Sequence, residues 1–306
     1  MNVVGQVSVL FFLMVIGWVA RKVKALDDLA IGRFSAFVVN IALPALIIVS
    51  LQRSFSPDLL GEAGIILALS LAMYALSFGL AFFYPTLIGA KGKERGVHRY
   101  AIIFSNVGFM GYPVVEAVLG KEALFHLAVY NVPFNLLAFS IGAWIIAREG
   151  ERKIKLSWRL MANPSVIATL MGFIFFLFSF RLPAPLYRTL EMTGNITSPL
   201  SMIVTGALLA RMDPRSILGR WRTYITTVMR LVLLPLLTCV ALYAIGMRGL
   251  LLSLPVLIAA MPIAANTTLL ANLYDGDVEN SGAMVFISTV ACIITIPFAV
   301  LLPGYF

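Results

Sequence analysis

The sequence has 306 residues, of which 60% are hydrophobic and only 12% are charged. A soluble domain of this composition would expose one large apolar surface, so the composition excludes a soluble domain. The formal net charge of +9 would suit a nucleic-acid partner, but the basic residues lie in short loops between apolar segments. That placement indicates a lipid bilayer and no nucleic acid.

Ten segments of about 18–25 mostly apolar residues follow one another, each long enough to cross a hydrocarbon core of about 30 Å. The first to tenth spans cover residues 2–20, 31–51, 60–84, 100–119, 123–147, 163–180, 190–210, 223–245, 250–273 and 281–303. The sequence therefore predicts an all-α polytopic membrane protein.

The loops after the first, third, fifth and seventh spans hold most of the 23 Lys and Arg residues. These residues are Arg21, Lys22, Lys24, Arg33, Lys91, Lys93, Arg95, Arg99, Arg148, Arg152, Lys153, Lys155, Arg159, Arg211, Arg215, Arg220 and Arg222. The positive-inside rule places these four loops in the cytoplasm and both termini outside it. The loop between the ninth and tenth spans, also expected in the cytoplasm, is acidic, but acidic residues count little in that rule.

A short motif recurs in the two halves of the chain. The second span contains Asn40-Ile41-Ala42-Leu43-Pro44, and the seventh contains Asn195-Ile196-Thr197-Ser198-Pro199. Each half has five spans, so the second half enters the membrane from the opposite side. We therefore predict two inverted five-helix repeats, residues 1–150 and 160–306, an architecture in which substrate binds near the midplane at the repeat interface.

The fourth span is interrupted near its centre by glycine and proline. Gly108 and Gly111 relax the backbone, and Pro113 lacks an N–H and clashes with the preceding turn. We expect a half-helix that begins near Tyr112 or Pro113, with its N-terminus pointing into the protein.

The ninth span is interrupted in the same way at Pro262, which is followed by Ala264, Ala265, Asn266 and Thr267. Broken helices survive at membrane depth where they line a cavity, because freed backbone groups find no partner in hydrocarbon. Two inward-facing half-helix N-termini carry partial positive charge, which favours an anion such as a carboxylate. The alternative is that both breaks are proline kinks that serve packing alone.

Asn106 and Asn266 are the candidate ligand residues of the two breaks. An amide that faces a cavity can donate to a carboxylate without the cost of burying a charge. The alternative role is an interhelical hydrogen bond that holds the two helices together. The hydroxyls of Ser288 and Thr289 in the tenth span are candidates to bond the exposed backbone of the breaks.

Two charged residues of the predicted spans are candidates for a role, namely Arg230, the only basic residue well inside a span, and Glu116. Arg230 either snorkels outward and anchors the structure, or pairs with an acid or steers an anion. Glu116, three residues after Pro113, suits the N-terminal helix dipole or serves in proton coupling. The sequence has no cluster with metal-ligand spacing and no catalytic constellation, so we expect no metal, no cofactor and no enzyme.

Short segments in six of the spans carry a family resemblance through their order and spacing. These segments are Ala42-Leu43-Pro44-Ala45-Leu46, Ser105-Asn106, Met110-Gly111-Tyr112-Pro113, Asn163-Pro164, Arg230 with Pro235, Met261-Pro262, Ala271-Asn272-Leu273-Tyr274, Ser288-Thr289 and Ile296-Pro297. Together they resemble the auxin efflux carrier family and, more distantly, the bile acid:sodium symporter fold. The chain lacks the long cytoplasmic loop of many plant members and is more similar to the bacterial malate and malonate permease-like members.

The resemblance implies ten helices, with crossed, unwound fourth and ninth helices. It also implies a scaffold of the first, second, sixth and seventh helices against a mobile core of the third to fifth and eighth to tenth. Homodimers would form through the scaffold, in the plasma membrane (the inner membrane of a bacterium). Asn40, Pro44 and Thr205 would line the scaffold side of the cavity, and Asn131 the core side.

The family pattern also has an amide at Asn106 and an arginine at Arg230. Plant members have lysine where this chain has Glu116, so the resemblance gives Glu116 no role. The predicted function is secondary transport of a small organic anion by elevator-type alternating access, with the cargo bound where the fourth and ninth helices cross. A sodium-coupled organic acid symporter of the bile acid type is one alternative, although Glu116 is the only carboxylate near the crossing. An anion channel is another, although the sequence lacks a charged ring or a repeated filter motif.

Overall fold

The computed structural model describes residues 3–150, 164–211 and 220–305. Within these residues the chain is helical, and an isolated antiparallel bridge joins Ser105 and Ile263 without any β-strand. Six residues used in the sequence analysis lie outside the described residues, namely Arg152, Lys153, Lys155, Arg159, Asn163 and Arg215.

Contacts divide the chain into two compact units. Unit 1 comprises residues 1–68, 108–135 and 162–211, and unit 2 comprises residues 69–107, 136–161 and 212–306. Each unit therefore draws on both halves of the chain.

Among the described residues, five helices are long and apolar enough to cross a membrane, namely Asp28–Ser50, Pro57–Leu87, Ala123–Glu149, Trp221–Ala244 and Val278–Gly304. Shorter apolar helices cover Val107–Leu119, Pro164–Leu177 and Gly249–Ala259. These helices confirm the predicted all-helical membrane protein by length and composition, whereas the count of ten spans and the inverted repeat stay predictions.

Unit 1 contains the N-terminal helices and the helices near the middle of the chain. They are α1 (Val3–Lys22), α2 (Asp28–Phe37), η1 (Val38–Ala42), α3 (Leu43–Ser50), the start of α4 (Pro57–Leu87), α6 (Tyr112–Leu119), α7 (Ala123–Tyr130), α8 (Val132–Leu137), α10 (Pro164–Leu177), α11 (Ala184–Asn195) and α12 (Thr197–Leu209). Helix α8 ends just beyond the boundary of this unit, and α3 packs against both α10 and α11.

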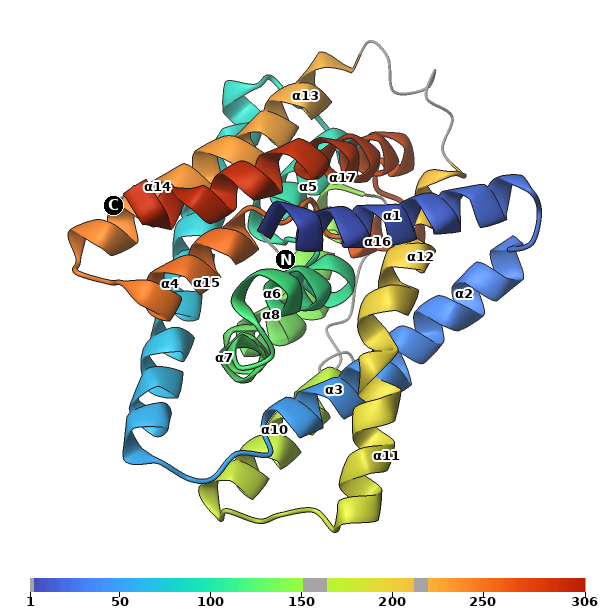
Figure 1. The fold of residues 1–306 in the computed structure, drawn as a ribbon. Helices are drawn as coiled ribbons and strands as arrows, with labels where there is room; N and C mark the ends of the chain where they lie inside the picture. The colour runs from blue at the N-terminus through green and yellow to red at the C-terminus, as the bar shows by residue number, and fades with distance from the viewer. Residues whose placement is uncertain (1–2, 151–163, 212–219, 306) are drawn as a thin grey trace. The chain divides into compact units, whose positions relative to one another are not determined.

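Helices α1 and α12 of unit 1 cross at very close range (Figure 1). A Cβ atom on Gly17 would lie 1.9 Å from the carbonyl oxygen of Ile203, and one on Gly206 would lie 1.8 Å from that of Met14. Any side chain at either position would clash, so the two glycines allow the backbones to touch, as small residues do between membrane helices.

Unit 2 contains the rest of α4 and most of the C-terminal helices. They are α5 (Lys93–Ile103), η3 (Ala138–Gly142), α9 (Ala143–Glu149), α13 (Trp221–Val228), η6 (Met229–Leu233), α14 (Leu234–Ala244), α15 (Gly249–Ala259), α16 (Asn266–Leu273), α17 (Val278–Leu301) and η7 (Leu302–Tyr305). Within this unit α5 packs against α9, α14 against α15, and α17 against both α13 and α16.

Three prolines each follow a π-helical turn by two residues. Pro44 follows η1, Pro113 follows η2 (Val107–Gly111) and Pro235 follows η6. A proline cannot donate a backbone hydrogen bond, and its ring clashes with the carbonyl four residues earlier. The wider π turn relieves both problems locally, so each of these helices continues through its proline.

The repeated Asn-Ile-x-x-Pro motif coincides with a helix irregularity in both copies. Asn40 lies in η1, whereas Asn195 is the last residue of α11 and Ile196 separates it from α12. Both copies therefore interrupt a regular α-helix within unit 1.

Candidate functional site

The fourth predicted span is broken earlier than the sequence analysis expected. Helix α5 ends at Ile103, and Phe104 takes an extended conformation with φ −110° and ψ 119°. Helical structure resumes at Val107 as η2 and continues into α6, where Pro113 lies near the N-terminus. The prediction of a half-helix starting at Tyr112 or Pro113 was therefore wrong, because the π turn accommodates the proline and the break precedes it.

The ninth predicted span is broken where Pro262 stands. Helix α15 ends at Ala259 and α16 begins at Asn266, which leaves a non-helical segment inside the predicted span. Pro262, Ile263 and Ala264 in this segment are buried. Its backbone groups therefore need partners within the protein.

The two breaks supply these partners to each other within unit 2. Ser105 and Ile263 form the antiparallel bridge. The Asn106 N–H donates to the Pro262 carbonyl at 2.8 Å, and the Ala264 N–H donates to the Phe104 carbonyl at 3.2 Å. The broken segments are thus joined by one antiparallel bridge and its two backbone hydrogen bonds, and we call this paired region the crossing.

A side chain of α17 completes the crossing. The Ile263 N–H donates to the Ser288 hydroxyl at 3.1 Å, as the sequence analysis anticipated for this residue. The neighbouring Thr289 hydroxyl is buried and has no hydrogen-bond partner among the described residues. Of the two candidate hydroxyls, Ser288 is therefore the one that hydrogen-bonds the backbone of the crossing.

Arg230 lies at the C-terminal ends of the two interrupted helices. Its side chain belongs to η6 and is only 4% exposed. One guanidinium nitrogen donates to the Ile102 carbonyl in the last turn of α5 at 2.8 Å, and Nε makes a longer contact of 3.4 Å with the Met261 carbonyl just beyond α15. The cation thus meets the carbonyls that a helix end leaves unpaired and that carry partial negative charge.

The opposite ends of the same breaks carry the two amides. Asn106 is buried just before η2, and Asn266 is the half-buried first residue of α16. The first N–H groups of a helix have no partner within it and carry partial positive charge. In unit 2 the carbonyl ends are therefore neutralised by Arg230, whereas the N–H end of α16 is not balanced by an acidic side chain of its own first turn.

The small residues expected at the site differ in what surrounds them. Ala264 is buried and Ala265 is half-buried, and the Thr267 hydroxyl donates to the Ala264 carbonyl at 2.6 Å. Apart from Gly108 itself, its two chain neighbours and the nearby backbone of its own helix, no described atom lies within 4 Å of the place where a Cβ on Gly108 would stand. Gly111 is buried at the start of α6. The Thr267 hydroxyl proton is therefore engaged in a hydrogen bond just before α16 and is not free for a ligand.

The candidate residues of unit 1 are described separately from the crossing. Asn40 is exposed and Pro44 is half-buried. The Thr205 hydroxyl donates to the Ser201 carbonyl within its own helix at 2.7 Å. A hydroxyl engaged in this way has only its acceptor lone pairs left for a ligand.

Tyr112 and Asn131 form a buried polar pair in unit 1. The Tyr112 phenol lies beside the Asn131 amide, but the hydroxyl makes no hydrogen bond of ordinary geometry. The amide nitrogen of Asn135 and the hydroxyl of Thr197 are also buried without a partner among the described residues. The sequence analysis did not name Thr197 as a candidate, although Thr197 stands inside the repeated motif.

Glu116 does not stand at a helix N-terminus. Helical structure begins at Val107, so Glu116 lies near the C-terminal end of its helix rather than in its first turn. The expected favourable dipole interaction was therefore wrong. Its carboxylate instead accepts a hydrogen bond of 2.7 Å from the Ser198 hydroxyl, also in unit 1. The described residues contain no group of three or more His, Cys, Asp or Glu side chains that could hold a metal ion.

Comparison with known proteins agrees with a membrane transporter. The chain belongs to the membrane transport protein family, whose family model matches residues 2–300. It is 29% identical to an "uncharacterized transporter" of Methanothermobacter thermautotrophicus, over 93% of each chain. It is 25% identical to a "putative malonate transporter" of Rhizobium meliloti, over 96% of this chain and 94% of the relative.

A plant relative connects the chain to auxin carriers. This chain is 23% identical to auxin efflux carrier component 8 of Arabidopsis thaliana, over 85% of this chain and 86% of the relative. The matches confirm the family resemblance inferred from the sequence. They also identify the family as transporters rather than enzymes.

Proposed function

We propose that this protein is a secondary transporter for small organic anions and that the crossing in unit 2 forms its anion site. The observation that carries the proposal is the pairing of two broken helices at Asn106–Pro262 and Phe104–Ala264. Such a pairing is costly at membrane depth, and transporters use it to place half-helix ends around a substrate.

The charge arrangement of the crossing favours a carboxylate over a cation. Arg230 occupies the carbonyl ends of α5 and α15 and would repel a cation from them. The first turn of α16 offers backbone N–H groups, and Asn266 and Asn106 add amide donors nearby in sequence. Oriented N–H groups and amides stabilise a negative ligand without a buried counter-charge.

Malonate is the first substrate to test, because a relative of nearly full coverage carries that substrate in its name. Malate shares the two carboxylates, and indole-3-acetate represents the aromatic acids that the name of the plant relative suggests. We propose dicarboxylates as the preferred class, since two carboxylates can use both half-helix ends.

We further propose that transport follows elevator-type alternating access with ten spans in two inverted repeats. The core of the third to fifth and eighth to tenth spans would carry the crossing past a scaffold of the other four. Asn40, Pro44, Thr205 and Asn131 would contact the cargo in one of its positions. Both termini would lie outside the cytoplasm of a bacterial inner membrane, and homodimers would form through the scaffold.

Coupling to protons, or uniport, is proposed over coupling to sodium. Sodium sites are built from carboxylate, carbonyl and hydroxyl oxygens. The side chains of Ser288 and Arg230 hydrogen-bond to the backbone of the two breaks, and neither is a carboxylate. A buried arginine beside the site would further weaken binding of a monovalent cation.

The test is uptake of labelled malonate, malate and indole-3-acetate by proteoliposomes, with voltage, pH and sodium gradients imposed one at a time. We expect saturable malonate uptake that a sodium gradient does not accelerate. Acceleration by sodium would establish the symporter alternative, and conductance that does not saturate would establish a channel. Well-folded protein that carries none of the three acids would refute the anion assignment.

A further inference from the structure

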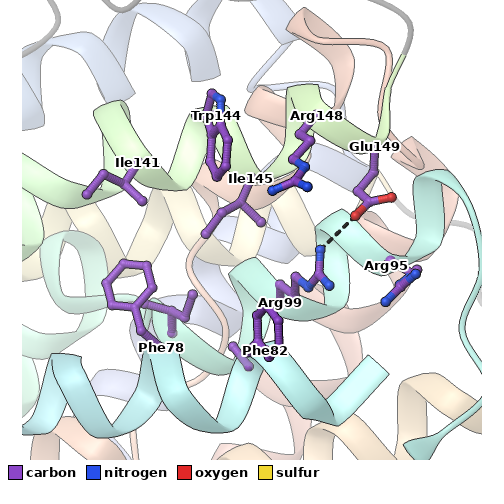
Figure 2. Close-up of a pocket in the computed structure, with 11 residues that line it drawn as sticks. Phe78, Phe82, Arg95, Arg99, Ile141, Trp144, Ile145, Arg148 and Glu149 are labelled. Carbon is purple, nitrogen blue, oxygen red and sulfur yellow. Dashed lines mark hydrogen bonds and ion pairs between the residues drawn. The ribbon is translucent and has the colours of Figure 1, made fainter. Parts of the chain in front are cut away.

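Unit 2 contains a pocket that is separate from the crossing. It lies between α4, α5 and the η3–α9 segment and has a volume of about 410 Å³. Figure 2 shows arginines of α5 and α9 on one side of it and aromatic and aliphatic side chains of α4 and α9 on the other. One end of the pocket is therefore cationic, and the remaining wall is apolar.

The cationic end holds three guanidinium groups, from Arg95, Arg99 and Arg148, and one carboxylate, from Glu149. Arg99 is neutralised, because it donates to Glu149 at 2.6 Å (Figure 2). Arg95 makes only a long contact of 3.5 Å with the Thr86 hydroxyl, and its Nε is buried without a partner among the described residues. Arg148 lies 5.2 Å above the Trp144 ring, and no ion pair joins it to another described residue.

Two arginines of the pocket thus lack an anionic partner within the part of the chain that the structure describes. Desolvating a guanidinium without a counter-charge is unfavourable, and a planar guanidinium binds phosphate oxygens in a fixed geometry. A ligand phosphate at this end of the pocket would supply the counter-charge that Arg95 and Arg148 lack, beside the existing pair of Arg99 and Glu149. Charge complementarity therefore indicates an anion.

The apolar wall restricts which anion fits. Phe82 is 66% exposed, Ile141 42% and Trp144 40%. In a membrane protein such exposed apolar side chains contact acyl chains rather than water. A small soluble anion would leave this wall without a partner, whereas a phospholipid would fill both parts of the pocket.

The location matches a lipid head group as well. Arg95, Arg99 and Arg148 belong to the basic loops that the positive-inside rule assigns to the cytoplasm. Basic pockets between membrane helices on that side attract anionic head groups from the inner leaflet. The geometry points to an anionic phospholipid whose phosphate binds at the cationic end of the pocket and whose acyl chains cover Phe82, Ile141 and Trp144.

A lipid bound in this pocket would stabilise the helix that leads into the crossing. Arg95 and Arg99 belong to α5, and α5 runs directly into Phe104, whose carbonyl pairs with Ala264. A lipid bound to α5, α4 and α9 at once would hold the three helices together. We expect anionic lipid to raise the melting temperature of the protein for this reason.

The experiment measures retention of phosphatidylglycerol, cardiolipin and phosphatidylcholine by the full chain in detergent, using native mass spectrometry and thermal melting. The double variant Arg95→Gln/Arg148→Gln should bind the two anionic lipids about tenfold or more weakly than the unaltered chain. Arg248→Gln is the matched control, because Arg248 is exposed and stacks on Tyr243 outside the pocket. It should bind like the unaltered protein.

Equal retention of phosphatidylcholine, or unchanged binding by the double variant, would overturn the proposal. Full competition by inorganic phosphate or malonate would instead assign the pocket to soluble anions and overturn the lipid assignment. If the double variant fails to fold, Arg148→Gln alone tests the exposed arginine, and Arg148→Lys should recover part of the binding. None of these readouts depends on whether the protein transports malonate.

Discussion

The two breaks that pair in unit 2 place their prolines differently. In the ninth span Pro262 lies inside the break, and its carbonyl accepts a hydrogen bond from Asn106. In the fourth span Pro113 follows the break by several residues and lies within a helix that a π turn adapts to it. A proline therefore does not by itself locate a break, and the pairing of backbone groups across the crossing is what stabilises the non-helical segments.

The supports of the two breaks differ as well. Arg230 contacts both, with the shorter hydrogen bond on the fourth-span side at Ile102. Ser288 supports only the ninth span, through Ile263. The break in the fourth span is thus stabilised by the Arg230 cation, and the break in the ninth span mainly by the Ser288 hydroxyl. Substitution of each residue in turn can separate these two contributions.

Arg230→Met should have the largest effect, because both breaks lose the cation that binds their carbonyls. Each hydrogen bond to a charged group contributes about 1.5–3 kcal/mol, so we expect a loss of about 3 kcal/mol or more of stability. Thermal melting in detergent measures this loss, and transport should be abolished. A variant that melts like the unaltered protein would show that Arg230 does not support the crossing.

Ser288→Ala should weaken only the ninth-span break. It leaves the buried N–H of Ile263 without its acceptor, at a cost of about 1–3 kcal/mol. The matched control is Thr289→Val, because the Thr289 hydroxyl has no partner among the described residues and its removal should cost little. Equal melting temperatures for the two variants would contradict the role of Ser288.

Pro262→Ala and Pro113→Ala compare the two prolines directly. Pro113→Ala should change stability by about 1 kcal/mol or less, because the helix already accommodates that position. Pro262→Ala should slow transport more than Pro113→Ala does, since it allows α15 to extend into the break. Melting curves together with initial rates of malonate uptake measure both effects. A stronger transport defect from Pro113→Ala would reverse the comparison.

Gly108→Ala should have the smallest effect on folding and a selective effect on transport. Outside its own helix backbone and chain neighbours, no described atom lies within 4 Å of the place where its Cβ would stand, so the protein should fold with nearly unchanged stability. If cargo occupies that space, malonate uptake should fall, and Gly108→Leu should lower it further. Normal uptake by Gly108→Leu would place the cargo elsewhere.

Much of the architecture could be predicted from the sequence, because hydropathy and helix length are local properties. The breaks near Asn106 and Pro262 and the role of Ser288 also follow from local chemistry, since freed backbone groups at membrane depth need partners. The start of the half-helix after the first break was misjudged, because the pairing of Phe104 with Ala264 decides where the break lies, and that contact joins residues far apart in the chain.

The remaining misjudgements also arise from long-range structure. Glu116 accepts a hydrogen bond from Ser198, on a helix from the other half of the chain. The pocket of Arg95 and Arg148 requires α5 and α9 to lie side by side, which basic loops alone do not indicate. Residue type and spacing thus indicated which segments are broken but not which residues they contact.

The central claim is that the amides beside the crossing bind an organic anion, and it is tested most directly by malonate uptake with Asn106→Ala and Asn266→Ala. The matched control is Asn272→Ala, an exposed amide near the end of α16. The proposal predicts that the two crossing variants lose uptake at an unchanged melting temperature while the control transports normally. Normal uptake by both crossing variants, or loss of uptake only through loss of folding, would contradict it.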